Sequence, residues 1–175
     1  MKTLRVWFYD PAADSEGFVN KVVASIDRPF CHVELQFADD RACSIYMGSK
    51  IAMRMRTFES PNYVCLQVPC SDTQHTIATG HAEHLHELGL VFSSLQMTSC
   101  LLWSAVANNP KHTFCSKLVT EILQQAGLVS DNIDAHLTSP SALHRLLLPQ
   151  TQIAPVHVLQ PSTRSVALDF KVRRN

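Results

Sequence analysis

The segment F-C-H-V-E-L-Q-F, from Phe30 to Phe37, decides the fold of this chain. Two sets of side chains alternate along it, an apolar set at Cys31, Val33, Leu35 and Phe37 and a polar set at His32, Glu34 and Gln36. A period of two is that of a β-strand, whose successive side chains point to opposite faces of a sheet. We therefore expect a strand with one face on a core and with His32 and Glu34 together on the other face.

Short strands are predicted on both sides of this segment. Residues 4–9 alternate in the same way and predict an opening strand that ends at Asp10-Pro11. Turn residues at Asp39-Asp40, Gly48-Ser49 and Ser60-Pro61 separate three further strands, expected over residues 42–47, 51–58 and 63–68. A meander of this kind favours an antiparallel sheet.

Helical signals accompany these strands. Helices are expected between Asp14 and Arg28 and over residues 72–88, 94–107, 113–126 and 139–148. Ser71 with Gln74 forms a capping box, and Gly89 and Gly127 stop the second and fourth of these helices. The remainder, residues 149–175, predicts strands over 156–159 and 166–172 and a basic tail with Lys171, Arg173 and Arg174. Together the signals predict one α+β domain over residues 1–175.

The composition limits the classes of function. The chain has 175 residues, of which 46% are hydrophobic and 17% charged, so it can bury a core and is not a disordered chain. Fifteen basic residues balance fifteen acidic ones, which argues against a basic surface for nucleic acid or an anionic membrane. No apolar run is long enough to span a bilayer, and the opening residues predict a strand rather than a signal peptide.

The cysteines indicate a reducing compartment. Six cysteines without a C-x-x-C pair predict neither a disulfide scaffold nor a zinc ribbon. We expect reduced thiols and a cytoplasmic protein, in a host's cytoplasm or a virion if the chain is viral. No cofactor and no metal ion is expected.

Cys115 is the strongest candidate for chemistry. On the helix predicted over residues 113–126 it lies in the middle of the apolar face formed by Leu118, Val119, Ile122, Leu123 and Ala126. It also lies in the first turn, where unpaired backbone N–H groups and the helix dipole favour a thiolate. The alternative is an ordinary core cysteine.

A thiolate needs a base and a group that orients the base. His32 and Glu34 share one strand face, about 7 Å apart along the chain, so Glu34 can support the imidazole of His32. The alternative is a polar strand face that points to solvent. Because Cys115 is expected to point inward, the two groups meet only if the helix start borders a cleft above that face. His112, three residues before Cys115, is a weaker alternative base.

Four stretches of the chain together resemble a known family. They are F-C-H-V-E-L-Q-F, the strand with Ser44 after an acidic turn, T-F-C-S-K-L-V at 113–119 and T-S-P-S-A-L-H-R-L-L at 138–147. Their order is similar to that of the circularly permuted NlpC-type papain-like cysteine peptidases of phages, large viruses and bacteria, in which the histidine strand precedes the cysteine helix. The resemblance covers about residues 4–148.

The resemblance implies a papain-like fold, with an antiparallel sheet or half-barrel packed against helices. It implies Cys115 as nucleophile, His32 as general base and then acid, Glu34 as the third polar member, and the amide of Cys115 or its neighbour as oxyanion donor. Lys117 departs from the family, which more often has an acidic residue there. The sequence around Cys115 also differs from that of the lecithin-retinol-acyltransferase-like relatives, which makes acyl transfer to lipid less favoured.

The expected activity is therefore hydrolysis of a peptide or isopeptide amide through an acyl-enzyme. A protein or peptide substrate is expected, such as a viral polyprotein or a ubiquitin-like modifier. Two alternatives stay open: a catalytically silent papain-like binding or structural module, and a thioester-forming acyltransferase. Neither the oligomeric state nor a role for Ser44 or Gln36 follows from the sequence.

The motif H-A-E-H-L-H raises the question of a metal site. His81 and His84 share a helix face, but His86 lies about 200° round the helix from His84, so the three cannot meet one ion. We interpret these residues as part of a solvated helix face.

Overall fold

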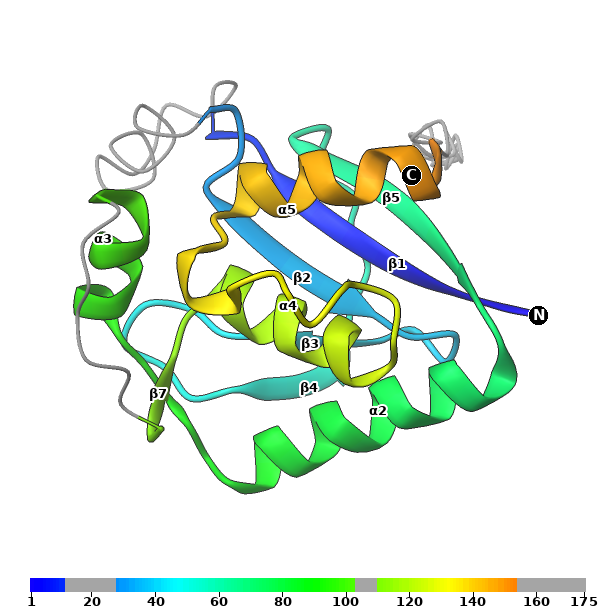
Figure 1. Cartoon of the computed structure of the whole chain (residues 1–175), viewed down its shortest axis with the longest axis horizontal. Coiled ribbons are helices and arrows are strands. Elements are labelled where there is room, and N and C mark those ends of the chain that lie inside the picture. The colour runs from blue at the N-terminus through cyan, green and yellow to red at the C-terminus, as the bar shows by residue number, and fades with distance from the viewer. Residues whose placement is uncertain (12–27, 103–109, 154–175) are drawn as a thin grey trace, which may run out of the picture.

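A six-stranded sheet forms the centre of the protein, and every neighbouring pair of its strands is antiparallel (Figure 1). The computed structural model describes residues 1–11, 28–102 and 110–153. In spatial order the strands are β4 (Ala52–Met55), β3 (Arg41–Ser44), β2 (His32–Gln36), β1 (Lys2–Tyr9), β5 (Tyr63–Cys70) and β8 (Gln152–Ile153). The prediction of an antiparallel sheet is confirmed.

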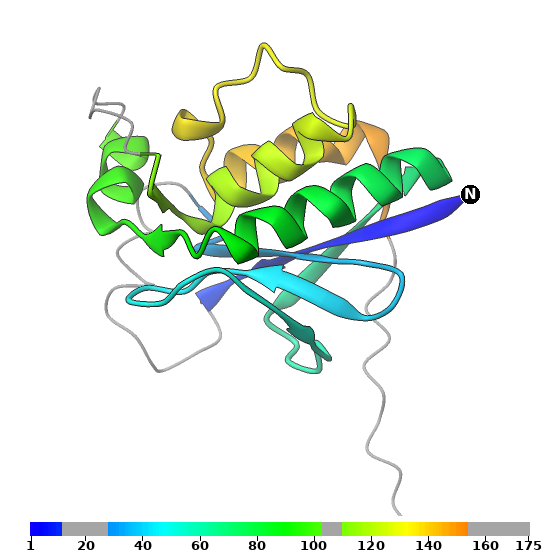
Figure 2. The same ribbon diagram turned by 90° about the horizontal axis from the view of Figure 1, so that it is seen from below.

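Helices form a layer on one face of this sheet. The helices are α2 (Asp72–Glu87), α3 (Ser94–Leu102), α4 (Cys115–Gln125) and α5 (Pro140–Leu147), with 3₁₀ turns at Ala135–Leu137 and Leu148–Gln150. Figures 1 and 2 show α2, α4 and α5 over the sheet, with α3 to one side. A short parallel pair, β6 (Val91–Phe92) with β7 (His112–Thr113), leads into α3 and α4. The α+β class is thereby confirmed.

The core lies between the helices and the central strands. Fully buried side chains come from both layers: Leu4, Val6 and Phe8 of β1, Val33 and Leu35 of β2, and Leu118, Val119, Ile122 and Leu123 of α4. In β1 burial alternates, as predicted from the period of two, and in β2 the apolar side chains alternate with polar ones. Because each buried Leu, Ile or Val stabilises the fold by roughly 1.5–3 kcal/mol, this layer fixes α4 against β2.

The second face of β2 is also buried, so the alternative of a solvent-facing polar strand is wrong. Glu34 is 0% exposed and Gln36 is 3% exposed. The chain after β4 packs against this face, where the rings of Phe58 and Trp7 stack 4.4 Å apart. Gln36 accepts a hydrogen bond from Trp7 Nε1 (2.8 Å) and donates one to the carbonyl oxygen of Arg56 (2.9 Å). The polar face is thus an interior one that needs its own hydrogen-bond partners.

The helix boundaries follow the local signals in the sequence. The capping box is present, because Gln74 N donates to Ser71 Oγ (3.1 Å) and Ser71 N donates to Gln74 Oε1 (3.0 Å). Gly89 and Gly127 have positive φ angles of 64° and 66°, as expected for helix stops. Ser139 caps α5 through the N–H of Ala142 (3.1 Å).

The cysteine helix begins two residues later than predicted, because Thr113 pairs with Phe92 in the β6–β7 ladder and Phe114 is extended. Cys115 is therefore its first residue. Several predicted features lie outside the described residues. They are the helix expected between Asp14 and Arg28, of which only Arg28 is described, the strands over 156–159 and 166–172, and the basic tail. The described C-terminal part ends in β8, which pairs with β5.

Candidate active site

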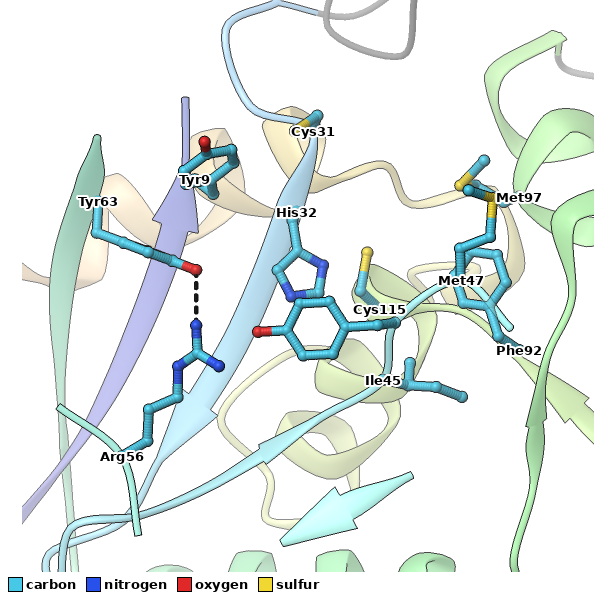
Figure 3. A pocket seen from close by; sticks show the side chains of 11 residues that line it. Tyr9, Cys31, His32, Ile45, Met47, Arg56, Tyr63, Phe92, Met97 and Cys115 are labelled. Atoms are coloured by element: carbon cyan, nitrogen blue, oxygen red, sulfur yellow. Dashed lines mark hydrogen bonds between the residues drawn. The ribbon is translucent and has the colours of Figure 1, made fainter. Parts of the chain in front are cut away.

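A pocket of about 470 Å³ opens where the start of α4 meets the start of β2 (Figure 3). Its lining comprises Tyr9, Cys31, His32, Ile45, Tyr46, Met47, Arg56, Tyr63, Phe92, Met97 and Cys115. The pocket thus contains both Cys115 and His32, as expected if the helix start borders a cleft above the polar strand face. Glu34 lies beneath the pocket, fully buried.

Cys115 is placed by the helix that it begins. The first intrahelical hydrogen bond runs from Leu118 N to the carbonyl oxygen of Phe114 (2.9 Å), and no side chain caps the helix at Phe114. The amides of Cys115 and Ser116 precede that bond, at the positive end of the helix dipole, so they are positioned to stabilise negative charge near the sulfur. Cys115 is only 3% exposed, and the pocket provides its access to solvent.

His32 stands beside the sulfur at the start of β2. Figure 3 shows one nitrogen of its ring turned toward Cys115 Sγ. The other nitrogen, Nε2, lies 3.5 Å from Glu34 Oε1, so the nitrogen that faces the sulfur is Nδ1. The ring of Tyr46 stacks on the imidazole with a centroid distance of 4.6 Å and an interplanar angle of 29°. The imidazole is thereby held on three sides.

The charge state of His32 depends on these neighbours. Burial by itself would lower the pKa of His32, but hydrogen bonds and charge interactions with Cys115 and Glu34 raise it to about 9. An imidazolium at neutral pH is the partner that a thiolate requires. At neutral pH the imidazole of His32 is therefore charged, and it lies beside the sulfur of Cys115.

Glu34 is a buried carboxylate with several partners. Burial would raise the pKa of Glu34, but His32, the Tyr46 hydroxyl and Arg56 together lower it. Four groups converge on its Oε1: Tyr46 Oη (2.7 Å), Arg56 Nη2 (3.0 Å), Tyr63 Oη (3.3 Å) and His32 Nε2 (3.5 Å). Glu34 thus remains ionised in the interior.

Arg56 supplies the positive charge that compensates Glu34. Its Nη2 also donates to the hydroxyl oxygen of Tyr63 (2.9 Å), as Figure 3 shows, and its guanidinium lies 5.0 Å from the centroid of the Phe58 ring. The hydrogen bond from Gln36 to the Arg56 carbonyl oxygen fixes the backbone at this point. Contacts with aromatic rings and with the backbone therefore hold Arg56 in place.

Sequence reasoning did not find Tyr46, Arg56 or Tyr63. The signal for Tyr46 lies in the pairing of β2 with β3, because it follows the strand that runs antiparallel to the His32 strand. Tyr63 begins β5, a predicted strand, and its place beside the site follows from the pairing of β5 with β1, in which it lies opposite Tyr9. Arg56 carries no such signal, because it lies in the chain after β4, outside any strand.

Gln36 and Ser44 differ in their relation to the site. Gln36 contacts the site indirectly, because its side chain donates a hydrogen bond to the carbonyl oxygen of Arg56. Ser44 is 1% exposed and does not line the pocket, and its Oγ has no hydrogen-bond partner among the described residues. The structure thus connects Gln36, but not Ser44, to the groups around Glu34.

The remaining histidine candidates lie elsewhere. His112 lines a different pocket, together with Lys117 and Glu121, so it is not placed as a base for Cys115. Of the H-A-E-H-L-H motif, His86 contacts the carbonyl oxygen of Ile51 through Nδ1 (2.8 Å), and His84 is exposed. In the described part of the chain no group of three or more His, Cys, Asp or Glu side chains could hold a metal ion.

Lys117, at the position where the resembled family more often has an acidic residue, is buried beside the start of α4. Its Nζ lies 3.8 Å from Glu121 Oε1, one turn further along the helix. This pair points into the pocket of His112 and away from Cys115. The departure at Lys117 therefore leaves the lining of the Cys115 pocket unchanged.

The other thiols are buried, and burial raises the pKa of several of them. Burial raises the pKa of Cys43 to about 12 and that of Cys65 to about 11. Burial and the nearby charge of Cys115 raise the pKa of Cys31, which lines the same pocket, to about 12. All six cysteines are free.

No family model, curated protein or solved structure matches this chain. In the described residues no helix is both long enough and apolar enough to cross a membrane.

Proposed function

We propose that this protein is a cysteine peptidase, a papain-like thiol hydrolase that cleaves a peptide or isopeptide amide. One observation carries the proposal: Cys115, at the first residue of a helix, shares a pocket with His32, and a buried carboxylate lies behind the imidazole. A nucleophile, a base and a group that orients the base are the components of thiol catalysis. The order of the histidine strand and the cysteine helix supports the permuted NlpC-type of this fold.

The first half of the reaction forms a thioester. The Cys115 thiolate attacks the carbonyl carbon, and the developing oxyanion accepts hydrogen bonds from the backbone amides at the start of α4. His32, as imidazolium, then donates its proton to the leaving nitrogen, and the C–N bond breaks. The amine product leaves and the acyl group stays on the sulfur.

The second half releases the acid. His32, now neutral, takes a proton from a water molecule, whose oxygen attacks the thioester carbonyl. The C–S bond breaks, the thiolate returns, and the imidazolium is restored beside Glu34. Glu34 does not touch the substrate in this scheme. It is a positioning residue that holds Nε2 and favours the charged imidazole.

The substrate of the proposed reaction is a protein or peptide. The resemblance to permuted NlpC-type peptidases supports a viral polyprotein or a ubiquitin-like modifier. Cysteine usage in the sequence supports a cytoplasmic setting, which for a viral protein is a host's cytoplasm or the virion.

Site-resolved alkylation with iodoacetamide tests this proposal. We expect Cys115 to react at pH 6, and Cys31 to stay unmodified, because the pKa of Cys31 is raised to about 12 although it lines the same pocket. In His32→Ala the preference for Cys115 should be lost. A peptide library digested by the wild-type protein should then show new termini that are missing with Cys115→Ala.

Slow alkylation of Cys115 that is indifferent to His32 would contradict the proposal. That result, with no Cys115-dependent cleavage, would favour a binding or structural module on the same scaffold. Stable acylation of Cys115 by a lipid donor, with transfer in place of hydrolysis, would instead identify an acyltransferase.

A further inference from the structure

The pocket has an apolar side that the proposed chemistry does not use. Met47 follows β3, Phe92 belongs to β6 and Met97 belongs to α3, and all three line the pocket of Cys115. Figure 3 shows them gathered beyond Cys115. Met97 and Cys115 also line a second, smaller cavity, which confirms that this side is adjacent to the sulfur. We call these three residues the apolar wall.

Exposure of the apolar wall suits a binding surface. Met47 is 58% exposed, although it stands at the mouth of a pocket where it could be covered. Exposed apolar side chains that gather at a cleft mark places where a ligand is bound. Methionine, with its flexible and polarisable side chain, adapts to apolar groups of varied shape.

The charges of the pocket lie on its other side. Among its lining residues the ionisable cations are His32 and Arg56, and both are engaged by Glu34. Among the residues that the structure describes, no carboxylate lines the pocket. A charged substrate group placed against the apolar wall would therefore lose hydration without gaining a partner, which is unfavourable.

The position of His32 decides which part of a substrate meets the apolar wall. His32 must reach the leaving nitrogen to protonate it, so the leaving group lies on the His32 side of the sulfur. Figure 3 shows the apolar wall on the opposite side of Cys115 from His32. The group attached to the carbonyl carbon is therefore the one directed toward the apolar wall.

We propose that Met47, Phe92 and Met97 form a subsite for a bulky, uncharged apolar side chain on the residue that provides the scissile carbonyl. This inference depends on the proposed thiol chemistry and adds a substrate class to it. The substrates are peptides with a residue such as leucine at that position, and aspartate is rejected there.

Affinity labels that differ only in this side chain test the subsite. N-acetyl chloromethyl ketones of leucine, alanine and aspartate place the side chain beside the reactive carbonyl. For each reagent, the rate of Cys115 alkylation is divided by the rate at which the same reagent alkylates glutathione. The result is divided by the rate at which iodoacetamide alkylates Cys115 in the same protein. We expect leucine to exceed alanine and aspartate by roughly tenfold or more, because even one methylene in an apolar pocket can be worth roughly tenfold and leucine has three more carbons than alanine.

Substitutions in the apolar wall should reduce this preference. In Met97→Gln and in Met47→Gln the ratio of leucine to aspartate should fall toward one. Met47 is exposed, so its substitution is compatible with folding, which thermal unfolding verifies. Leu95→Gln is the matched control: Leu95 is 66% exposed on the same helix as Met97 but does not line the pocket, and its ratio should equal that of the wild type.

The outcomes separate this inference from the proposed function. Equal normalised rates for leucine and aspartate, with alkylation still dependent on His32, would overturn the subsite and leave the thiol chemistry standing. A ratio in Met97→Gln and Met47→Gln that stays at the wild-type value would also overturn it. Iodoacetamide labelling indifferent to His32 would overturn the proposed function, and the subsite with it.

Discussion

The Arg56 guanidinium and the Glu34 carboxylate are 3.0 Å apart, from Nη2 to Oε1, and the side chain of Glu34 is 0% exposed. An unpaired carboxylate in this position would be costly to bury, and His32, the Tyr46 hydroxyl and Arg56 together keep Glu34 ionised beneath the pocket. Glu34 belongs to β2, and Arg56 lies in the segment directly after β4. The Glu34 carboxylate connects the charge on His32 to Arg56, which lines the same pocket.

Breaking this pair from one side should be more harmful than removing both charges. Arg56→Met removes the nearer of the two cations beside the buried Glu34 carboxylate, and we expect the free energy of unfolding to fall by about 3–5 kcal/mol. The double variant Arg56→Met with Glu34→Gln should recover a large part of that loss. Urea denaturation of the wild type, both single variants and the double variant measures the coupling. Additive effects of the two substitutions would contradict a direct pair.

Much of the fold can be predicted from the sequence because its signals are local. The alternation of 30–37, the capping box at Ser71 and the stop at Gly127 each depend on a few neighbouring residues, and the structure has all three features. The start of the cysteine helix is misplaced because a tertiary pairing, Thr113 with Phe92, overrides the local helical preference.

In the candidate site too, some residues can be predicted from local sequence patterns and others cannot. Cys115, His32 and Glu34 are found from spacing alone, because a strand and a helix start each place their side chains predictably. Tyr46 and Arg56 are missed because their contacts with Glu34 arise from strand pairing and loop packing between distant segments. The burial of Glu34 is also missed, since alternation shows two faces of a strand but not what covers each of them.

The titration of His32 should report its neighbours directly. Its pKa is about 9 in the folded protein because Cys115 and Glu34 outweigh the effect of burial. NMR of the imidazole signals should give that value in the wild type and a lower one in both Glu34→Gln and Cys115→Ala. His81 and His144, whose pKa values burial lowers, serve as internal references in the same spectra. A His32 pKa near 6.5 in the wild type would contradict the charged pair.

Stability at acid pH should depend on Glu34. The pKa of Glu34 is lowered from 4.5 in the folded state, so its ionisation stabilises the protein above that value, and this contribution is lost as pH falls through the folded pKa. The difference in unfolding free energy between wild type and Glu34→Gln should therefore shrink as pH falls below about 4.5.

Glu83→Gln is the control for this measurement. It removes an exposed ion pair with Arg41, which should contribute little at any pH. A wild-type advantage over Glu34→Gln that is constant from pH 7 to pH 3 would show that shape, and not charge, accounts for the role of Glu34.

Tyr46 should act as a positioning residue for His32, and comparison with Tyr63 can separate this role from simple packing. Both hydroxyls donate to Glu34 Oε1, at 2.7 Å from Tyr46 and 3.3 Å from Tyr63, but only the Tyr46 ring is stacked on the imidazole. Tyr46→Phe should shift the pKa of His32, because Glu34 loses a donor that shares its charge, and should reduce the free energy of unfolding by about 1.5–3 kcal/mol, the contribution of a hydrogen bond to a charged group. Tyr63→Phe should have smaller effects on both.

Tyr46→Ala removes the ring as well as the hydroxyl, so it should also slow the alkylation of Cys115 at pH 7 beyond the effect of Tyr46→Phe. Thermal unfolding of each variant distinguishes a local change from a loss of fold, and the His32 titration is the decisive measurement because a purely structural role would not shift it. If Tyr63→Phe shifts the His32 pKa as much as Tyr46→Phe does, the shorter hydrogen bond and the stacked ring have no special role in positioning His32.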